Sequence, residues 1–474
     1  MATLTVCLSM LLLLAFSGIV TSRTIVETLP GWNGTLPFKL ETGYIAVDDF
    51  DEVNLFYYFV ESDRNPIEDP LVLWLTGGPG CSGFSAFAYE IGPFTFDLHY
   101  NGSIPTIVMN PYSWTKVANI IFIDAPVGAG FSYSTTSDGW YTSDTKQAAQ
   151  TYTFLRKWLY THPQYQGNQL YIGGDSYSGL IVPILLKNIL EGLDAGLKPR
   201  MQLQGYLLGN PVTDNFIDVN MRIPYVHRVS LISDEIYQAA KSNCSEDYVN
   251  YEINNTLCVT ALQKIKDCLL QINLAQILEP QCAFASGRTT EDNPTTELEW
   301  DLKAREASTM EYLLSESNAL PELHCRGYTY VLAYRWMNDK TVRAALGVRN
   351  GTVENWVRCP KALTYYTEEL TSSLAYQKNL SETGLRALIY SGDHDISVPW
   401  IATQYWIKAL DVAVFDEWRP WYVNGQIAGY QVKFMNDNFR LTYVTVKGAG
   451  HTAPEYKHKE TLAMFDRFLA RYPI

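Results

Sequence analysis

The amino-acid sequence predicts an α/β architecture built on a largely parallel sheet. Six short apolar runs, each followed by a turn signal, are typical of buried strands and occupy residues 71–75, 119–123, 169–172, 204–208, 385–390 and 441–446. Helical patterns lie between several of these runs, at residues 145–160 and 182–193. Strands that alternate with helices are typical of a parallel sheet flanked by helices, and no internal repeat interrupts the order.

The length and the charge limit the possible partners. The chain has 474 residues, of which 47% are hydrophobic, and this is enough to bury a sizeable core. Its net charge of −14 argues against nucleic acid and anionic membranes as partners, because both attract cationic surfaces. The acidity says little about the substrate.

The first residues predict a secretory signal peptide over 1–22. Residues 6–20 are almost all apolar, and the first charge in the chain is Arg23. This run is too short to span a bilayer comfortably, so a membrane anchor is the weaker interpretation. We expect cleavage near Ser22.

Sequons and cysteines after this peptide favour an oxidising, glycosylating compartment. The sequons begin at Asn33, Asn101, Asn243, Asn254, Asn350 and Asn379. The cysteines are Cys81, Cys244, Cys258, Cys268, Cys282, Cys325 and Cys359. Because their number is odd, at least one thiol stays free or pairs outside this set.

Residues from about 211 to 323 break the alternation of strands and helices and predict an inserted cap over the sheet. This stretch holds most of the cysteines and two sequons. Within it, residues 286–317 contain few large apolar side chains, so they cannot bury enough surface to offset their ordering entropy. We expect an exposed, protease-accessible linker there, with a plain acidic loop as the alternative.

A serine flanked by small residues follows the third predicted strand. The residues Gly173-Gly-Asp-Ser176-Tyr-Ser-Gly179 stand between a strand and a helical pattern, which is the context of a nucleophile elbow. The usual pattern has glycine where this chain has Ser178, a small residue that we expect to keep the turn. A Gly-x-Ser match alone is also compatible with a structural turn. A serine hydroxyl is a poor nucleophile by itself, so the catalytic hypothesis requires a histidine base and an orienting carboxylate.

His451 is the candidate base, since it follows the run at 441–446 through a glycine-rich turn. The candidate acids are Asp393 and Asp395, which share the loop after the run at 385–390. The chain order Ser, Asp, His is that of α/β-hydrolases, so the sequence predicts this fold with a triad on Ser176. The other histidines lack such a setting and are expected at the surface: His99, His162, His227, His324, His394 and His458.

Acyl transfer also needs an oxyanion hole, which this fold builds from the residue after the nucleophile and from an early loop. The loop after the run at 71–75 contains Gly77, Gly78 and Gly80, which let the backbone approach a substrate closely. We assign the backbone N–H groups of Gly78 and Tyr177 to the oxyanion hole. A plain tight turn is the alternative for this loop.

Four loops together resemble the plant serine carboxypeptidase-like family, of the peptidase S10 type. They are Trp74-Leu-Thr-Gly-Gly-Pro-Gly-Cys-Ser82, Gly174-Asp-Ser-Tyr-Ser-Gly179, Tyr390-Ser-Gly-Asp-His-Asp395 and Gly448-Ala-Gly-His-Thr-Ala-Pro454. The resemblance implies that Asp395 is the triad acid and that Asp393 has a structural role. It also implies the disulfides Cys81–Cys359, Cys244–Cys258 and Cys282–Cys325, with Cys268 unpaired. Some relatives lose the linker by proteolysis and persist as two disulfide-joined chains, and we expect the same here.

Several positions are similar to the acyltransferase branch of this family. The family's peptidases typically carry Asn at the position of Thr76 and Glu at the position of Asp175. The segments Gly205-Tyr-Leu-Leu-Gly-Asn-Pro211 and Trp418-Arg-Pro-Trp421 also look like that branch. The resemblance implies substrate contacts from Trp74, Thr76, Gly77, Glu90 and Asp175. For Trp74, Glu90 and Asp175 the alternative is packing of the sheet and bracing of the elbow.

The resemblance implies an enzyme whose partners are a small-molecule acyl donor, a 1-O-β-glucose ester, and an acceptor hydroxyl or amine. We expect no metal and no cofactor. A serine carboxypeptidase that releases C-terminal residues at acidic pH is the alternative function, and a binding protein without catalysis is a third possibility. The resemblance suggests the secretory pathway, with the vacuole or the extracellular space as destination.

Overall fold

The computed structural model describes residues 22–99, 102–280, 326–360, 363 and 365–474. Several predicted features therefore lie outside the described residues. They are residues 1–21 of the predicted signal peptide, the sequon at Asn101, the linker at 286–317, His324 and the Cys282–Cys325 pair. In the part of the chain that is described, no helix is long and apolar enough to cross a membrane.

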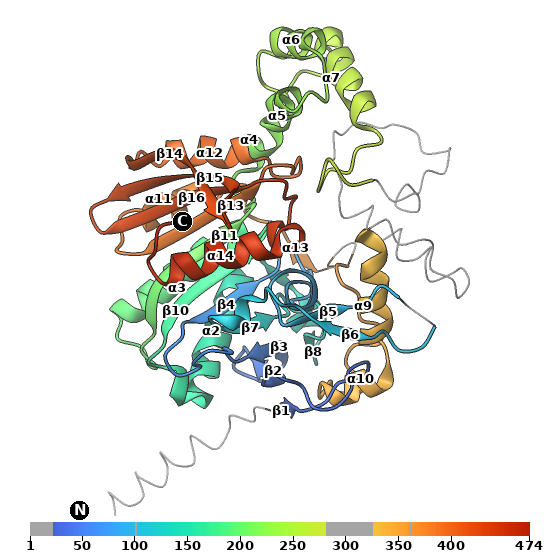
Figure 1. The fold of residues 1–474 in the computed structure, drawn as a ribbon, viewed down its shortest axis with the longest axis vertical. Coiled ribbons are helices and arrows are strands. Elements are labelled where there is room, and N and C mark those ends of the chain that lie inside the picture. Colours follow the sequence, from blue (N-terminus) through green and yellow to red (C-terminus); the bar gives the residue numbers. More distant parts are fainter. Residues whose placement is uncertain (1–21, 100–101, 281–325, 361–362, 364) are drawn as a thin grey trace, which may run out of the picture.

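A 12-stranded sheet forms the centre of the protein, and its six middle strands are parallel (Figure 1). In spatial order they are β7 (Asn119–Ile123), β4 (Leu71–Leu75), β10 (Gln169–Asp175), β11 (Gln202–Gly209), β13 (Arg386–Gly392) and β16 (Phe439–Val446). Each of the six predicted runs overlaps one of these strands, so the predicted α/β-hydrolase fold with its largely parallel centre is confirmed.

Antiparallel strands that we did not predict extend the sheet on both sides. One side adds β3 (Val53–Val60), β2 (Leu40–Ala46) and β1 (Ser22–Val26), with β8 (Tyr133–Ser134) paired to β3. The other side adds β15 (Gln426–Asn436) and β14 (Ala413–Val423). Much of β14 is exposed and Pro420 interrupts its pattern, which weakens its signal in the sequence.

Side chains of the parallel strands alternate between two apolar cores, one on each face of the sheet. In β4, Leu71, Leu73 and Leu75 pack on the side of α2 (Asp144–Thr161) and α3 (Ser178–Asp194). Val72 and Trp74 pack on the opposite side, with α14 (His458–Leu469). The smaller helices α9 (Thr329–Met337), α10 (Lys340–Ala345), α11 (Leu374–Leu380), α12 (Trp400–Ala409) and α13 (Ala453–Tyr456) complete the flanking layers (Figure 1).

The described part of the predicted cap is helical and follows β11. It comprises α4 (Asn215–Asn220), α5 (Arg222–Arg228), α6 (Asp234–Asn243) and α7 (Thr256–Leu269). Figure 1 shows α6 and α7 beyond the edge of the sheet rather than over its face. Their apolar sides form a separate core that also takes in Ile396 and Ile401 from the β13–α12 region.

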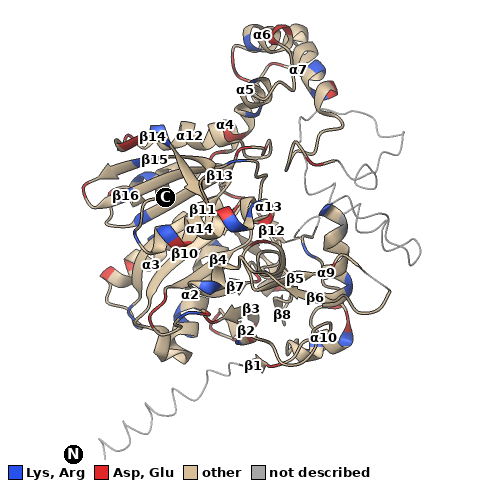
Figure 2. Cartoon of the chain, viewed as in Figure 1, with Lys and Arg blue, Asp and Glu red and all other residues tan. Residues whose placement is uncertain are grey.

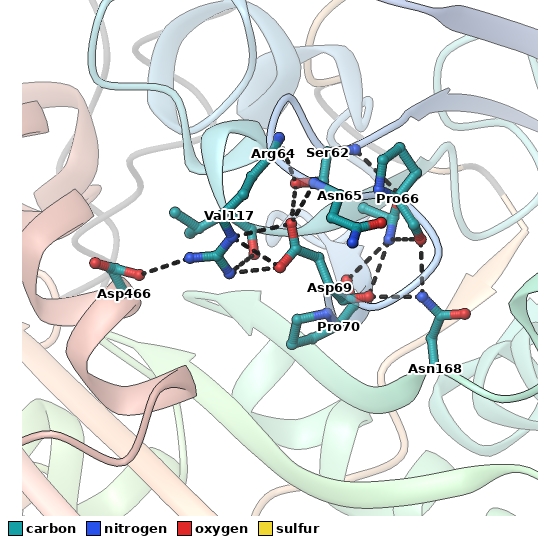
Figure 3. Close-up of polar contacts among 10 residues, drawn as sticks. Ser62, Arg64, Asn65, Pro66, Asp69, Pro70, Val117, Asn168 and Asp466 are labelled. Atoms are coloured by element: carbon teal, nitrogen blue, oxygen red, sulfur yellow. Dashed lines mark hydrogen bonds and ion pairs between the residues drawn. The ribbon is translucent and has the colours of Figure 1, made fainter.

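A polar loop holds the amino ends of three parallel strands together. The carboxylate of Asp69 accepts from Ser62 Oγ at 2.6 Å and from Arg64 Nε at 2.9 Å (Figure 3). The side-chain amides of Asn119, where β7 begins, and Asn168, just before β10, both donate to the Asp69 carbonyl. Because β4 begins two residues after Asp69, these bonds align its start with β7 and β10. The opposite, carboxyl ends of these strands carry the candidate site.

Charged side chains are spread over the outside of the fold. Figure 2 shows both signs on the outer helices and at strand ends.

Candidate active site

Ser176 lies on a tight turn between β10 and α3. Its φ of 54° is unusual for a residue other than glycine, as expected for a nucleophile elbow. A Cβ on Gly174 would lie 2.7 Å from the Leu75 carbonyl oxygen, and one on Gly179 would lie 2.3 Å from that of Val212. Ser178 keeps the turn, because its hydroxyl donates to the Leu75 carbonyl at 3.0 Å.

Three loops at the carboxyl ends of β10, β13 and β16 bring the predicted triad together. The Nε2 of His451 lies 2.7 Å from the Ser176 hydroxyl, and its Nδ1 lies 2.7 Å from Oδ2 of Asp395. A carboxylate against Nδ1 keeps the proton on that nitrogen, so Nε2 is free to accept the serine proton. The arrangement can therefore activate the Ser176 hydroxyl as a nucleophile.

Asp395 is completely buried and held by its own loop. Its carboxylate accepts from the backbone N–H of Ser397 at 2.7 Å and of Val398 at 3.2 Å. The side-chain amide of Asn210 donates to it at 2.9 Å. We missed Asn210 in the sequence, although it stands before Pro211 at the end of a buried strand and has a positive φ of 40°.

Asp393 does not face the imidazole of His451. Its Oδ1 accepts from the backbone N–H of Gly448 at 2.7 Å, and its own carbonyl accepts from the Tyr225 hydroxyl at 2.8 Å. The carboxylate therefore braces the turn that leads from β16 to His451. Of the two candidate acids that the residues left open, the geometry places Asp395 in the triad.

The glycine loop after β4 lies against the nucleophile, where the oxyanion hole was predicted. A Cβ on Gly77 would lie 2.6 Å from Cβ of Ser176 and 2.9 Å from the backbone nitrogen of Tyr177. Gly78 has a φ of 120°, which strongly favours glycine. Only a glycine at position 77 therefore allows this approach, which brings the loop that carries Gly78 against the nucleophile turn of Ser176 and Tyr177.

Two anchors hold this glycine loop in place. The Cys81–Cys359 disulfide ties it to a distant segment. Buried Asp124 accepts from Ser82 Oγ at 2.6 Å and from the backbone N–H of Gly83 at 2.8 Å. Burial raises the pKa of Asp124 to about 7, although these hydrogen bonds act in the opposite direction.

A pair of buried carboxyls lies beside the elbow. Burial raises the pKa of Glu90 well above its usual range, and the charges of Asp175 and Glu455 raise it further. Burial also raises the pKa of Asp175, although the imidazole of His451 and the backbone N–H of Gly77 lower it. Two adjacent buried carboxyls resist double ionisation, so the pair retains a proton at a pH where exposed carboxyls have lost theirs.

Several buried polar atoms of this region have no hydrogen-bond partner among the described residues, and they include Thr76 Oγ1, Glu90 Oε2 and Asp175 Oδ1. Buried polar atoms without a partner are uncommon and costly, which marks the region as functional or hydrated. We refer to Thr76, Glu90 and Asp175 as the buried polar group. Within the described chain no cluster of His, Cys, Asp and Glu side chains is arranged to hold a metal ion.

Trp74 belongs to the core rather than to an open site. Its side chain is completely buried, and its ring packs edge-on against Trp114 with the centroids 5.4 Å apart. A Cβ on Gly173 would lie 2.7 Å from the Trp74 ring, so the strand backbone packs directly on it. Of our two interpretations of Trp74, this geometry favours the packing of the sheet over a substrate contact.

The prediction that the remaining histidines lie at the surface is wrong for His162. This side chain is only 2% exposed and stacks on Trp158. Its Nδ1 lies 2.8 Å from the Trp158 carbonyl and its Nε2 lies 2.8 Å from Glu41. Burial is tolerated because both ring nitrogens have partners, which the local sequence does not show.

Two of the three disulfides that the resemblance implied are present. Cys81 pairs with Cys359, and Cys244 pairs with Cys258 across the ends of α6 and α7. Cys268 is free and exposed, as expected.

Comparisons with known proteins agree with this fold. The sequence profile of the serine carboxypeptidase family matches residues 30–471. Serine carboxypeptidase-like 7 of Arabidopsis thaliana is 42% identical over 471 residues, which cover 99% of this chain and 98% of that protein. Serine carboxypeptidase-like 13 of the same plant is 43% identical over 468 residues, which cover 98% of each chain.

Among solved structures, Kex1(delta)p, a prohormone-processing carboxypeptidase from Saccharomyces cerevisiae, has the same fold. The TM-score is 0.68 at 18% identity, and the match covers 92% of each chain. From the family profile and the full-length plant relatives together, we conclude that the chain belongs to the serine carboxypeptidase family.

Proposed function

We propose that this protein is an acyltransferase that moves an acyl group from a 1-O-β-glucose ester to an acceptor hydroxyl or amine. The intermediate is an acyl group esterified to Ser176. The observation that carries the proposal is the buried polar group beside the nucleophile. It holds Thr76 and Asp175 at the positions where the family's peptidases typically have Asn and Glu.

The reaction uses the triad in two balanced halves. His451 takes the proton of the Ser176 hydroxyl as its oxygen attacks the ester carbonyl, and the N–H groups of Gly78 and Tyr177 stabilise the oxyanion. The bond to the glucose oxygen breaks, and His451 returns the proton to that oxygen. In the second half, His451 takes a proton from the acceptor, the acceptor attacks the acyl carbon, and Ser176 leaves with the proton.

The chemistry of the buried polar group supports a sugar rather than a peptide carboxylate. A sugar hydroxyl both donates and accepts hydrogen bonds, and a pair of carboxyls that retains one proton offers both roles. A peptide carboxylate needs donors, and the Thr76 hydroxyl supplies one where the amide of Asn supplies two. Asp175 is one methylene shorter than Glu, which changes the separation between its carboxyl and that of Glu90.

A serine carboxypeptidase active in acid is the second candidate. The raised pKa values of Glu90 and Asp175 favour it, because a protonated carboxyl can donate to the C-terminal carboxylate of a peptide. The names of the plant relatives say carboxypeptidase-like and do not distinguish the two activities. A binding protein without catalysis is the weakest candidate, since the triad atoms are within hydrogen-bond distance.

The test compares the two activities in one preparation. Purified glycosylated protein is incubated with a phenolic glucose ester and a panel of hydroxyl and amine acceptors, and in parallel with a blocked dipeptide. We expect acylated acceptor and free glucose in equal amounts, both absent in Ser176→Ala. Brisk release of the C-terminal residue without any transfer would reverse the proposal in favour of the peptidase.

A double variant tests the residues behind this choice. Thr76→Asn combined with Asp175→Glu restores the typical peptidase residues, so we expect the ratio of peptide release to acyl transfer to rise about 10-fold or more. The matched control is Thr76→Ser, which keeps the hydroxyl. An unchanged ratio in the double variant would contradict the role of the buried polar group in donor selection.

The processing and destination of the protein are also proposals. The apolar N-terminus and the sequons support entry into the secretory pathway, with the vacuole or the extracellular space as destination. We further propose two disulfide-joined chains after excision of the linker. Reducing gels of mature protein from its own tissue should then show two bands, and a single full-size band would contradict the excision.

A further inference from the structure

The last described residues of the cap return from α7 and lie between the two loops that carry the triad acid and base. The backbone N–H of His451 donates to the Ala275 carbonyl at 2.8 Å. On the other side, the N–H of Ile396 donates to the Leu274 carbonyl at 2.9 Å. Two consecutive carbonyls of the cap thus accept hydrogen bonds from the backbone of His451 and from that of Ile396, the residue after Asp395. We call residues 274–279 the bridging segment.

Further contacts extend this connection on both sides. The side-chain amide of Gln276 donates to the Gly448 carbonyl at 3.1 Å, in the turn before His451. The N–H of Ile277 donates to the His394 carbonyl at 3.1 Å, directly before Asp395. A Cβ on Gly450 would lie 2.3 Å from the Ala275 carbonyl oxygen, so a glycine is needed where the segment crosses the loop.

Arg326 fastens the end of the bridging segment to the helix that follows His451. Its guanidinium makes a bidentate contact with Glu279, with Nη2 to Oε1 at 2.7 Å and Nε to Oε2 at 3.2 Å. The same group donates from Nη1 to the Glu455 carbonyl at 3.1 Å. It also lies over the Tyr456 ring, 4.4 Å from the centroid. One side chain therefore connects the cap to α13.

The triad needs this kind of support because Asp395 and His451 stand on separate loops. Each loop leaves the sheet after its strand, β13 or β16, and the parallel ladder between these strands ends at Gly392 and Val446. Beyond that point, each triad residue depends on loop contacts for its position. A displacement of a reacting group by about 1 Å costs on the order of 100-fold in rate.

We propose that the bridging segment and Arg326 position the triad, holding the His451 loop and the Asp395 loop at the separation that their hydrogen bond requires. None of these residues contacts the reacting atoms, so they are positioning residues. The cap is then a structural part of the active site and not only a cover beside it.

The first test compares Arg326→Met with Arg419→Met. Arg419 makes a bidentate ion pair with Asp416 on β14 at 2.8 Å, and the exposures of 39% and 31% are close to the 32% and 27% of Arg326 and Glu279. The measurement is the rate at which a small organophosphonate labels Ser176. We expect about a 10-fold slower rate in Arg326→Met and the wild-type rate in Arg419→Met. Equal rates in both variants, whether slowed or unchanged, would overturn the proposal.

A spectroscopic measurement separates positioning from general destabilisation. We expect the proton on Nδ1 of His451, which bonds Asp395, to give a downfield NMR signal in the native protein. We expect this signal to shift or broaden in Arg326→Met and to return largely in Arg326→Lys, which keeps the charge. An unaltered signal in Arg326→Met would count against positioning.

A second pair of variants decides the matter if Arg326→Met does not fold. Gln276→Met removes the bond to the Gly448 carbonyl at similar side-chain size, and Glu279→Gln removes the charge opposite Arg326. We expect the labelling rate to fall about 3-fold in each, and wild-type rates in both would overturn the proposal. Labelling needs neither acyl donor nor acceptor, so this result is independent of the proposed function.

Discussion

The triad and the buried polar group lie next to each other and differ in how their polar atoms are satisfied. In the triad, Asp395 accepts from His451, Asn210 and two backbone N–H groups, and both imidazole nitrogens have partners. In the buried polar group, one oxygen of each of Thr76, Glu90 and Asp175 has no partner among the described residues. The hydrogen bonds of the triad are therefore made within the protein, whereas the buried polar group has atoms that can still form hydrogen bonds with a ligand or with water.

Because of this difference, the triad supplies the chemistry that all substrates share, and the buried polar group selects among substrates. A completed triad attacks any ester or amide carbonyl that reaches it, so its geometry does not choose a substrate. Unsatisfied buried polar atoms penalise every ligand that fails to bond with them, and they therefore discriminate strongly between ligands. We expect changes in the triad to remove all activities together and changes in the buried polar group to redistribute them.

The largest effect is expected from Ser176→Ala. Without the hydroxyl no acyl-enzyme forms, so turnover of any substrate should fall by about 10⁶-fold. The measurement is the initial rate with the glucose ester and with the dipeptide, together with circular dichroism to verify the fold. Residual activity near the wild-type level would refute the serine mechanism outright.

A comparison of Asp395→Asn with Asp393→Asn should give the next largest effect. Asn in place of Asp395 no longer stabilises the productive tautomer of His451, so kcat should fall about 10⁴-fold. Asn in place of Asp393 keeps an oxygen acceptor for the Gly448 N–H, so kcat should change less than about 10-fold. Similar losses in the two variants would mean that the acid is wrongly assigned.

Glu90→Gln should change the buried polar group and leave the triad unaffected. The amide cannot ionise and replaces one carboxyl oxygen by an NH2 group, so we expect the KM for the glucose ester to rise about 10-fold. The organophosphonate labelling rate of Ser176 should stay at the wild-type value, because the triad is untouched. A parallel loss of labelling would show that Glu90 supports the triad instead.

The smallest effect concerns stability and pH. The pKa of Glu90 is raised in the folded protein, so its contribution to stability is fully present below about pH 4.3, the pKa of an exposed Glu. That contribution is lost as the pH rises through the folded value.

Gln has no proton to lose, so Glu90→Gln should gain stability relative to wild type as the pH rises above about 4.3, the pKa of an exposed Glu. The gain is about 1.4 kcal/mol for each unit by which the pKa is raised. Differential scanning calorimetry of both proteins across this range measures it. A constant difference in Tm would contradict a raised pKa for Glu90.

The parallel strands and the candidate triad could be predicted from the amino-acid sequence, because both depend on local patterns. Apolar runs buried on both faces have a clear signal, and the runs at 71–75 and 119–123 coincide with β4 and β7. The serine and histidine were identified from the glycine-rich turns around them. The hairpin of β14 and β15, in which β14 is largely exposed and β15 is only partly buried, has no such pattern, and we did not predict it.

Which side chains meet across the loops could be seen only in the folded protein. Asp393 and Asp395 are two residues apart in the same loop, and their roles follow from the directions of their side chains. Asn210, Gln276 and Arg326 approach the triad from distant parts of the chain, and Trp74 turned out to be packed in the core. Such contacts depend on the packing of whole elements, which no local pattern of residues encodes.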